Sequence, residues 1–342
     1  METYSSKIDR IDGNSRLPKY RQVINTILEE INQELFKPGD RIPSINETSE
    51  EYYLSRDTVE KAYKELSLRG IISSIPGKGF YVNGNLEIAK LKVLVIFDKL
   101  TTHNKVIYNA LVKTLGNKAS VNFNVHQYDF KYFEDTVLDN LGTYDYYVVM
   151  PHFYDFRYDV CQILKKVPAN KLLILDKKPK ALTNNYACVY QDYSKDLEKA
   201  LFSALDLLQK YRKIYLVYPK SIQYPREIRV GFRNFCHDAD IDYDLISSTE
   251  NIIPQKGEAF LIMEEPDIIN MIKKGRKQKL EIGKDLGIIS YNDNPMNEIV
   301  ENGITALTTD HFKMGQTAAD MILHKKRQKV KNPFYLVRRN SL

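Results

Sequence analysis

Basic and hydroxyl side chains gather in one short stretch of this 342-residue chain. A helix beginning after Ser55 would carry Arg56 and Thr58 in its first turn, with Lys61 and Lys64 further along its polar side. Arginine can donate two hydrogen bonds to guanine or phosphate, and hydroxyl groups and first-turn amides suit phosphate oxygens. The spacing is typical of a helix that enters a DNA major groove, although a solvated helix covering a core has the same pattern.

A second group of candidate residues lies in the turn Gly77-Lys78-Gly79. β-type runs at residues 71–75 and 80–82 flank this turn, which predicts a hairpin. The glycines would let the turn approach a minor groove, with Lys78 as the charged contact. The turn does not match a nucleotide-binding P-loop, in which the lysine is followed by serine or threonine.

The elements that must position these groups can be predicted in order. An apolar stripe predicts a helix over residues 19–35, and Ser44 and Glu47 form a capping box that starts a short second helix. The helix that carries Arg56 and Thr58 is predicted over residues 55–69 and ends at Gly70, and the hairpin follows it. Three helices and a hairpin predict a winged helix-turn-helix domain over residues 1–83, and Ser44 is a further candidate DNA contact.

Residues 17–82, including PGDRIPS, SRDTV and GKGFYV, resemble the DNA-binding domain of GntR-family transcription regulators. In that family an arginine after the turn serine, a threonine two residues on, and the wing glycine touch the operator. The resemblance assigns these roles to Arg56, Thr58 and Gly77. Glu60 stands where the family often has arginine, and Asn46 stands where it often has glutamate or arginine. The resemblance therefore leaves the operator sequence open.

Composition restricts the class of protein. The net charge is +6, but residues 1–83 hold twelve Lys/Arg against thirteen Asp/Glu, so a few well-placed cations must bind any DNA. The three cysteines are an odd number without paired spacing, and the sequence has neither a signal-type h-region nor a long apolar run. These features predict a soluble cytoplasmic protein outside the membrane. Six scattered histidines predict no metal site, and no cofactor motif is present.

A linker over residues 84–91 precedes a body over residues 92–342 in which strand-like and helix-like runs alternate. Repeated β-α-β units predict an α/β body of two lobes, each a parallel sheet flanked by helices. The predicted strands are residues 92–97, 121–126, 146–150, 171–175, 214–218, 259–263 and 287–290, and the clearest helices are 106–115, 197–211, 227–236 and 314–325.

Polar side chains follow several of these strands, where open α/β sheets bind ligands. Carboxylates, amides and aromatic rings suit the hydroxyls and C–H faces of a sugar, although each group could equally be satisfied within its own loop. The candidate effector-binding residues at these strand ends and at the predicted hinge are Asp98, Thr101, Thr102, His152, Asp176, Asp192, Glu264 and Asn292.

Residues 287–342 are similar to the end of lactose-repressor-type regulators, on the basis of LTT at 307–309, Met314-Gly315 and the closing VRRNS. The resemblance implies a type I periplasmic-binding-protein-like domain that holds a small molecule between its lobes. GntR-type heads on such bodies form the arabinose-repressor subfamily. The family's cleft arginine falls on Ile228, so Arg226 and Arg229 on either side are both candidates.

These observations predict a non-enzymatic, homodimeric DNA-binding regulator, with repression of a carbohydrate operon relieved by a monosaccharide or derivative. Two alternatives stay open. One is a sugar-modifying α/β enzyme, against which stand the missing G-x-S-x-G, Walker A and G-x-G-x-x-G motifs. The other is a DNA-binding regulator whose body only dimerises.

Overall fold

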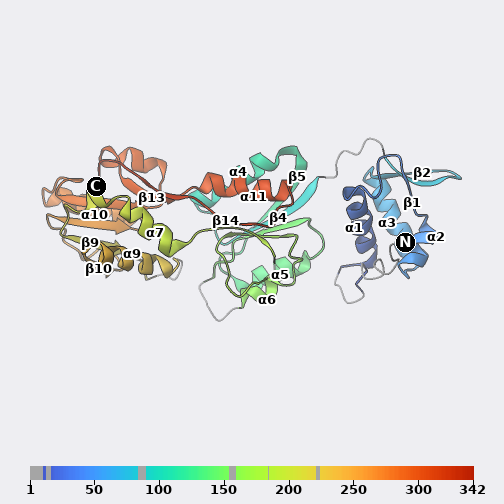
Figure 1. Cartoon of the computed structure of the whole chain (residues 1–342), viewed down its shortest axis with the longest axis horizontal. Helices are drawn as coiled ribbons and strands as arrows, with labels where there is room; N and C mark the ends of the chain where they lie inside the picture. The colour runs from blue at the N-terminus through green and yellow to red at the C-terminus, as the bar shows by residue number, and fades with distance from the viewer. Residues whose placement is uncertain (1–10, 13–16, 84–89, 154–158, 184, 221–223) are drawn as a thin grey trace.

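The computed structural model describes residues 11–12, 17–83, 90–153, 159–183, 185–220 and 224–342. It shows three successive units along the long axis of the molecule, namely a head, lobe 1 and lobe 2 (Figure 1). Among the described residues, no helix is long and apolar enough to cross a membrane.

The head consists of three helices and a small antiparallel sheet. Its sheet has the strand order β1-β3-β2, and β2 and β3 form the hairpin. The apolar stripes of α1 and α3 meet in a core that includes Val23, Ile27, Val59 and Leu66, which confirms the predicted winged architecture. The elements are α1 (Lys19–Asn32), β1 (Arg41–Ile42), α2 (Ile45–Glu51), α3 (Arg56–Leu68), β2 (Ile72–Ile75) and β3 (Gly79–Val82).

Lobe 1 is a six-stranded, fully parallel sheet in the order β14-β8-β7-β6-β4-β5. Helices α4 and α11 cover one face, and α5 and α6 cover the other. The strands are β4 (Leu91–Phe97), β5 (Ala119–Val125), β6 (Tyr146–Val149), β7 (Leu172–Asp176), β8 (Ala187–Tyr190) and β14 (Lys329–Lys331). The helices are α4 (Thr102–Leu115), η3 (Gly116–Lys118), α5 (Phe130–Asp139), α6 (Val160–Leu164) and α11 (His311–Leu323).

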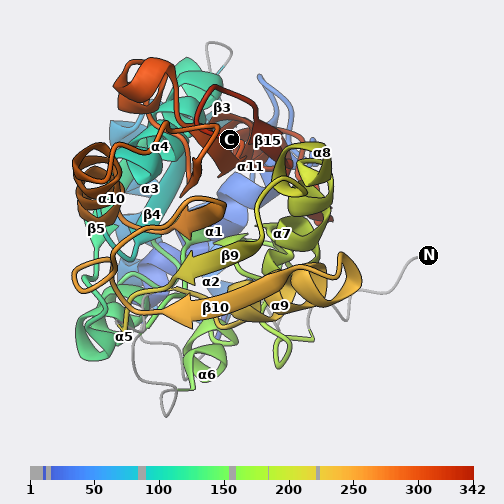
Figure 2. The same ribbon diagram turned by 90° about the vertical axis from the view of Figure 1, so that its left-hand side faces the viewer.

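Lobe 2 is a second six-stranded sheet, parallel except for β15, with the strand order β10-β9-β11-β12-β13-β15. Figure 2 shows this lobe facing the viewer. Helices α7 and α9 pack on one face, and α10 packs on the other. The strands are β9 (Lys213–Val217), β10 (Asp242–Ile246), β11 (Glu258–Ile262), β12 (Leu286–Tyr291), β13 (Thr305–Thr309) and β15 (Phe334–Val337). The helices are α7 (Tyr193–Phe202), α8 (Leu205–Leu208), α9 (Glu227–Asp238), α10 (Glu265–Lys277), η4 (Pro295–Glu298) and η5 (Val300–Asn302).

Three chain segments connect the lobes, after β8, β13 and β14. They lie against one another at the hinge, where the Asn332 backbone N–H donates to Tyr190 O at 2.8 Å. The Asn332 side chain donates to Asp310 O at 2.9 Å, and the Asp310 N–H donates to Pro333 O at 3.0 Å. The three connecting segments are therefore joined to one another by hydrogen bonds at the hinge.

The structure departs from the sequence prediction at two elements. The single helix predicted over 197–211 is broken into α7 and α8, because the Ser203 hydroxyl donates to the Ala200 carbonyl at 2.6 Å and competes with the helix backbone. The second departure is β15, which is antiparallel to β13 in a sheet predicted to be parallel. Most of the predicted linker lies outside the described residues, and β4 begins at Leu91.

Two helical glycines allow close helix packing, one in each lobe. A Cβ atom on Gly231 of α9 would lie 2.2 Å from Ser194 O of α7. A Cβ atom on Gly315 of α11 would lie 2.2 Å from Ile107 O of α4. Any larger residue must push these helix pairs apart.

Candidate DNA-binding surface and interlobe cleft

Helix α3 presents its first turn to solvent. Its N-cap residue is Ser55, whose Oγ lies 2.8 Å from Thr58 Oγ1, and Arg56 beside them is exposed. The opposite face, which includes Tyr63 and Leu66, is buried in the head core. The exposed N-terminal turn can therefore offer a guanidinium group, a hydroxyl group and free backbone amides to DNA.

Helix α2 holds α3 in place through a hydrogen bond between Thr48 Oγ1 and Tyr63 Oη at 2.8 Å. The predicted capping box is present, because Glu47 N donates to Ser44 Oγ at 3.2 Å and Ser44 N donates to Glu47 Oε2 at 2.6 Å. The bonds from the Ser44 backbone and side chain lower the pKa of the Glu47 carboxyl. The Ser44 hydroxyl thus serves as the α2 cap, and its DNA contact stays a prediction.

The wing turn needs its glycines. Gly77 has φ +74° and Gly79 has φ +108°, a region that L side chains rarely adopt. Lys78 between them is exposed, and its backbone N–H closes the turn on Ile75 O at 2.9 Å. The hairpin therefore carries one cation at its tip.

The two candidate lysines of α3 differ in their surroundings. Lys61 Nζ lies 4.3 Å from the centroid of the Tyr20 ring on α1, so this ammonium group is held against the head by a cation–π contact. Lys64 lies one turn further along α3 and is exposed. Lys64 is consequently the freer of the two to approach a phosphate.

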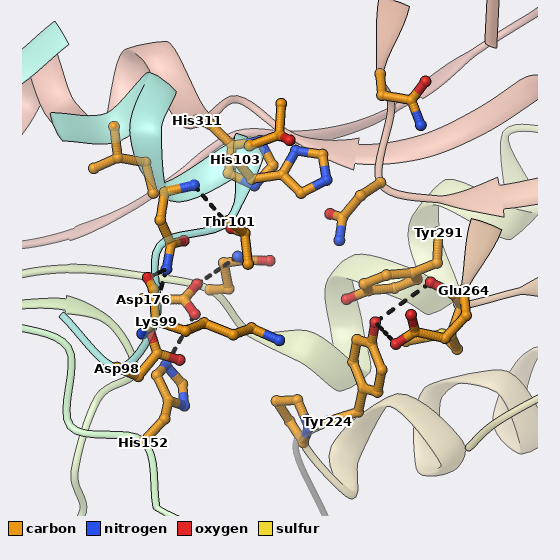
Figure 3. Close-up of a pocket in the computed structure, with 18 of the residues that line it drawn as sticks. Asp98, Lys99, Thr101, His103, His152, Asp176, Tyr224, Glu264, Tyr291 and His311 are labelled. Carbon is orange, nitrogen blue, oxygen red and sulfur yellow. Dashed lines mark hydrogen bonds and ion pairs between the residues drawn. The ribbon is translucent and has the colours of Figure 1, made fainter. Parts of the chain in front are cut away.

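A cleft of about 520 Å³ lies between the lobes. Its walls are formed by the carboxyl ends of the strands of both sheets and by the first turns of the helices that follow them (Figure 3). Seven of the ten predicted effector residues line it: Asp98, Thr101, Thr102, His152, Asp176, Glu264 and Asn292.

Asp176 is the centre of the lobe 1 wall. Its Oδ2 accepts from His152 Nε2 at 3.0 Å and from Tyr193 Oη at 2.7 Å, and its Oδ1 accepts from Gln191 Nε2 at 2.6 Å. Burial opposes both charges, but the hydrogen bonds and mutual attraction outweigh it: the pKa of Asp176 is lowered and that of His152 is raised. The network holds this half-buried ion pair in the wall of the cleft.

Asp98 forms a second acidic point on the same wall. It is 8% exposed, and its Oδ1 accepts from Lys99 N at 2.8 Å and from Asn104 Nδ2 at 3.0 Å. Thr101 caps α4 by accepting from Asn104 N at 3.1 Å. The carboxylate is therefore oriented by its own loop while its edge lines the cleft.

The lobe 2 wall is built from tyrosines and a carboxylate. Tyr224 Oη donates to Glu264 Oε1 at 2.8 Å. Tyr291 is 6% exposed and stands beside them at the end of β12 (Figure 3). Burial raises the pKa of Tyr291, which keeps its hydroxyl group protonated. The next residue, Asn292, has φ +75°, and its N–H donates to Leu307 O at 2.8 Å.

Two cleft histidines were not predicted. The rings of His103, on α4, and His311, on α11, stack with centroids 4.7 Å apart. Burial lowers the pKa of both, and burial together with the neighbouring His103 lowers that of His311 to about 4. Both are therefore neutral near pH 7. His311 comes two residues after the LTT strand, so strand-end position was the signal that could have identified it.

Three predicted effector residues lie outside the described lining. Asp192 caps α7, where its Oδ1 accepts from Lys195 N at 3.4 Å. The Arg229 guanidinium carbon lies 5.1 Å from the centroid of the Tyr218 ring, so this arginine packs along lobe 2. Arg226 is the N-cap residue of α9 and also stands apart from the lining.

The cleft also contains lining residues that the sequence did not identify. Some follow a predicted residue closely in sequence, and others lie near the starts of the lobe 2 helices. Unpredicted members of the wall include Lys99, Tyr128, Tyr193, Tyr224 and Tyr291. In the part of the chain that the structure describes, no group of three or more His, Cys, Asp or Glu side chains could hold a metal ion. The cleft is thus a hydrogen-bonding and aromatic site.

Comparison with known proteins gives two separate family matches, one to the head and one to the C-terminal part of the body. Residues 19–82 match the family described as bacterial regulatory proteins, gntR family. Residues 207–342 match the periplasmic binding protein-like domain. The chain joins a gntR-family head to a periplasmic-binding-protein-like body. The GntR-type head and the two-lobed body predicted from sequence are thereby confirmed.

Curated relatives match this GntR-type head over short stretches. The repressor YtrA of Bacillus subtilis is 40% identical over 78 residues, 23% of this chain and 60% of the relative. The arabinose metabolism transcriptional repressor of Geobacillus stearothermophilus is 39% identical over 67 residues, 20% of this chain and 18% of the relative. The chain thus spans 60% or less of the length of these relatives.

Solved structures resemble the body. The lac repressor dimer bound to operator and an anti-inducer has a TM-score of 0.59 at 16% identity, covering 75% of this chain and 95% of its own. A LacI family regulator from Enterococcus faecalis with bound ribose has a TM-score of 0.58 at 18% identity, covering 73% and 98%. At these identities the likeness establishes the fold.

Proposed function

We propose that this GntR-headed protein is a transcription repressor whose affinity for operator DNA changes when a sugar or sugar derivative binds between the lobes. The observation that carries this proposal is a cleft with polar strand-end groups from both lobes, in a chain that also bears a winged head. Repressors among the head's relatives and sugar-bound regulators among the body's structural neighbours support it.

The head would read DNA through α3 and the wing. Arg56 and Thr58 at the start of α3 would contact a base edge and a phosphate, with Lys64 as a further phosphate contact. Lys78 at the wing tip would approach the adjacent minor groove. Glu60, which is also exposed on α3, would accept from a cytosine amine or repel phosphate, and so restrict the operator sequence.

The body would act by changing the relation between two heads. A homodimer would place two heads on the half-sites of an inverted repeat, and closure of the lobes around a ligand would alter their spacing. The ligand can shift this equilibrium only by the difference between its affinities for the two lobe arrangements. A cleft that both lobes line supplies such a difference.

The test is binding of the purified protein to DNA upstream of its own gene, at about 150 mM salt, where non-specific phosphate binding is already weak. The assay is repeated with a panel of monosaccharides and excess competitor DNA. Tight binding released by one sugar is the expected result. Absence of specific binding with and without every sugar would overturn the operator assignment.

The polar lining also bears on the two other interpretations of the body. A module that only dimerises needs no carboxylate network in a cleft wall such as that around Asp176, so the lining favours a ligand. Asp98, Asp176 and Glu264 resemble a catalytic carboxylate set only in composition, because hydrogen bonding to hydroxyl groups explains them without chemistry. Turnover of a sugar by the purified protein would favour the enzyme instead.

A further inference from the structure

One corner of the cleft, on lobe 2, combines two tyrosine rings with a carboxylate. On lobe 2, the rings of Tyr224 and Tyr291 stand nearly perpendicular, with centroids 6.5 Å apart and an interplanar angle of 82°. The Glu264 carboxylate lies beside them and accepts from Tyr224 Oη (Figure 3). Two aromatic rings and a carboxylate are the groups that surround organic ammonium ions in proteins.

Tyr291 supplies an independent sign of a missing ligand group. Its side chain is 6% exposed, its hydroxyl end is directed into the cleft, and no hydrogen bond closes on that hydroxyl group among the described residues (Figure 3). The ring of Tyr291 is buried, whereas its hydroxyl group opens onto the cleft, where a ligand group can hydrogen-bond to it.

The charge balance of the lobe 2 wall selects the kind of partner. Among the described lining residues, lobe 2 contributes Glu264 and Glu265 but no lysine, arginine or histidine. The arginine nearest in sequence to the family's cleft arginine, Arg229, packs over Tyr218 instead. The cleft lysines, Lys99 and Lys105, belong to lobe 1. The two carboxylates accept from Tyr224 and Asn294, which are neutral, so an anionic ligand group at this wall would meet negative charge without a cationic side chain of lobe 2.

We propose that the corner formed by Tyr224, Glu264 and Tyr291 binds a protonated amine, and that the effector is an amino sugar of the hexosamine type. The ammonium group donates to the Glu264 carboxylate and to Tyr291 Oη, and it lies against the tyrosine rings. The sugar hydroxyls then face Asp98, Asn292 and the neutral histidines. This inference rests on the proposed function only in taking the cleft as the effector site.

Matched pairs of ligands test the inference. Binding of glucosamine, galactosamine and mannosamine to the full-length protein is compared by calorimetry with that of glucose, galactose and mannose at up to about 10 mM, and with glucose 6-phosphate. At least one amine should bind about tenfold or more tightly than its neutral partner, because a charge-assisted hydrogen bond is strong enough to give that ratio of affinities.

Two substitutions separate charge from packing. Glu264→Gln keeps an acceptor for Tyr224 and should reduce the preference for the amine about tenfold, because only the charge is lost. Tyr291→Phe keeps the ring and should produce a smaller loss. Glu250→Gln, an exposed carboxylate of lobe 2 away from the cleft, is the control and should leave the preference unchanged.

Several results would overturn the inference. Equal or tighter binding of a neutral sugar would mean that Lys99 from lobe 1, or water, occupies the corner instead. Tightest binding of the phosphate, an unchanged preference in Glu264→Gln, or no binding of any amine would equally reject it. Release of operator DNA by a neutral sugar would reject the amine but retain the repressor, whereas failure of DNA binding rejects the repressor alone.

Discussion

At the scale of single residues, the pair His152–Asp176 in the cleft wall has the most definite consequence. Burial opposes ionisation of both residues, and their hydrogen bond and mutual attraction outweigh it. The raised pKa of His152 gives stability that is complete below its ordinary value of 6.5 and is lost as the pH rises through the higher folded value. The lowered pKa of Asp176 gives stability above 3.8 that is lost as the pH falls further.

We predict that Asp176→Asn lowers the free energy of unfolding by about 1–3 kcal/mol near pH 6, because it removes a charge-assisted hydrogen bond. Asparagine suits the positive φ of +70° at this position, so the backbone should be preserved. Denaturation followed from about pH 6 to about pH 8 should show the loss shrinking as His152 deprotonates in the parent protein. A loss that grows with pH would contradict the assigned pKa shift.

Arg56 gives the corresponding prediction for DNA. Arg56→Ala should weaken operator binding by about 1–3 kcal/mol and relax the preference at one base position, because a bidentate donor is removed. Fluorescence anisotropy at fixed salt measures this loss. Arg69→Ala is the matched control at the other end of α3, where the arginine pairs with Glu65. Equal losses in both variants would contradict a base contact by Arg56.

At the scale of elements, the wing has a single cation at its tip. Lys78→Ala should weaken binding to all operator sequences alike and reduce the slope of log affinity against log salt by about 1, because one phosphate contact is lost. Lys131→Ala, an exposed lysine of α5 in lobe 1, serves as the control. An unchanged slope for Lys78→Ala would remove the wing from the DNA interface.

The closely packed pair α7 and α9 gives a prediction about stability. Gly231→Ala should destabilise lobe 2 by about 1–3 kcal/mol, because the new methyl group would meet the Ser194 backbone carbonyl. Gly275→Ala on α10 is the matched control, since its methyl group would meet only the end of the Leu286 side chain, which can move. Thermal unfolding of both variants should therefore rank Gly231→Ala as the less stable.

Local patterns predicted most elements, but the cleft only in part. The capping box at Ser44 and the glycines of the wing act through neighbours within a few residues, so sequence alone placed them. In this structure Asp192 caps α7 and Arg229 packs against the Tyr218 ring, so their contact with an effector stays a prediction. A polar side chain at a strand end or a helix start has two outlets: the cleft, or its own helix and a neighbouring ring. Only the tertiary packing chooses between these outlets.

At the scale of the whole molecule, we predict a dimer. Light scattering should give twice the chain mass of 39.8 kDa, and operator affinity should fall when one half-site of an inverted repeat is scrambled. A monomer that binds a single half-site as tightly as the complete operator would contradict this arrangement. If a ligand closes the lobes as proposed, it should change the DNA affinity and leave the mass of the dimer unchanged.

The interleaving of the lobes also determines the order in which the chain can become functional on the ribosome. Lobe 1 needs α11 and β14, which follow nearly all of lobe 2 in the sequence, whereas the head has its own core within the first 83 residues. A nascent chain can therefore fold its DNA-reading part long before either lobe is complete. A nonsense mutation ahead of residue 311 would leave a chain with a complete head and an incomplete lobe 1, because α11 and β14 would be missing.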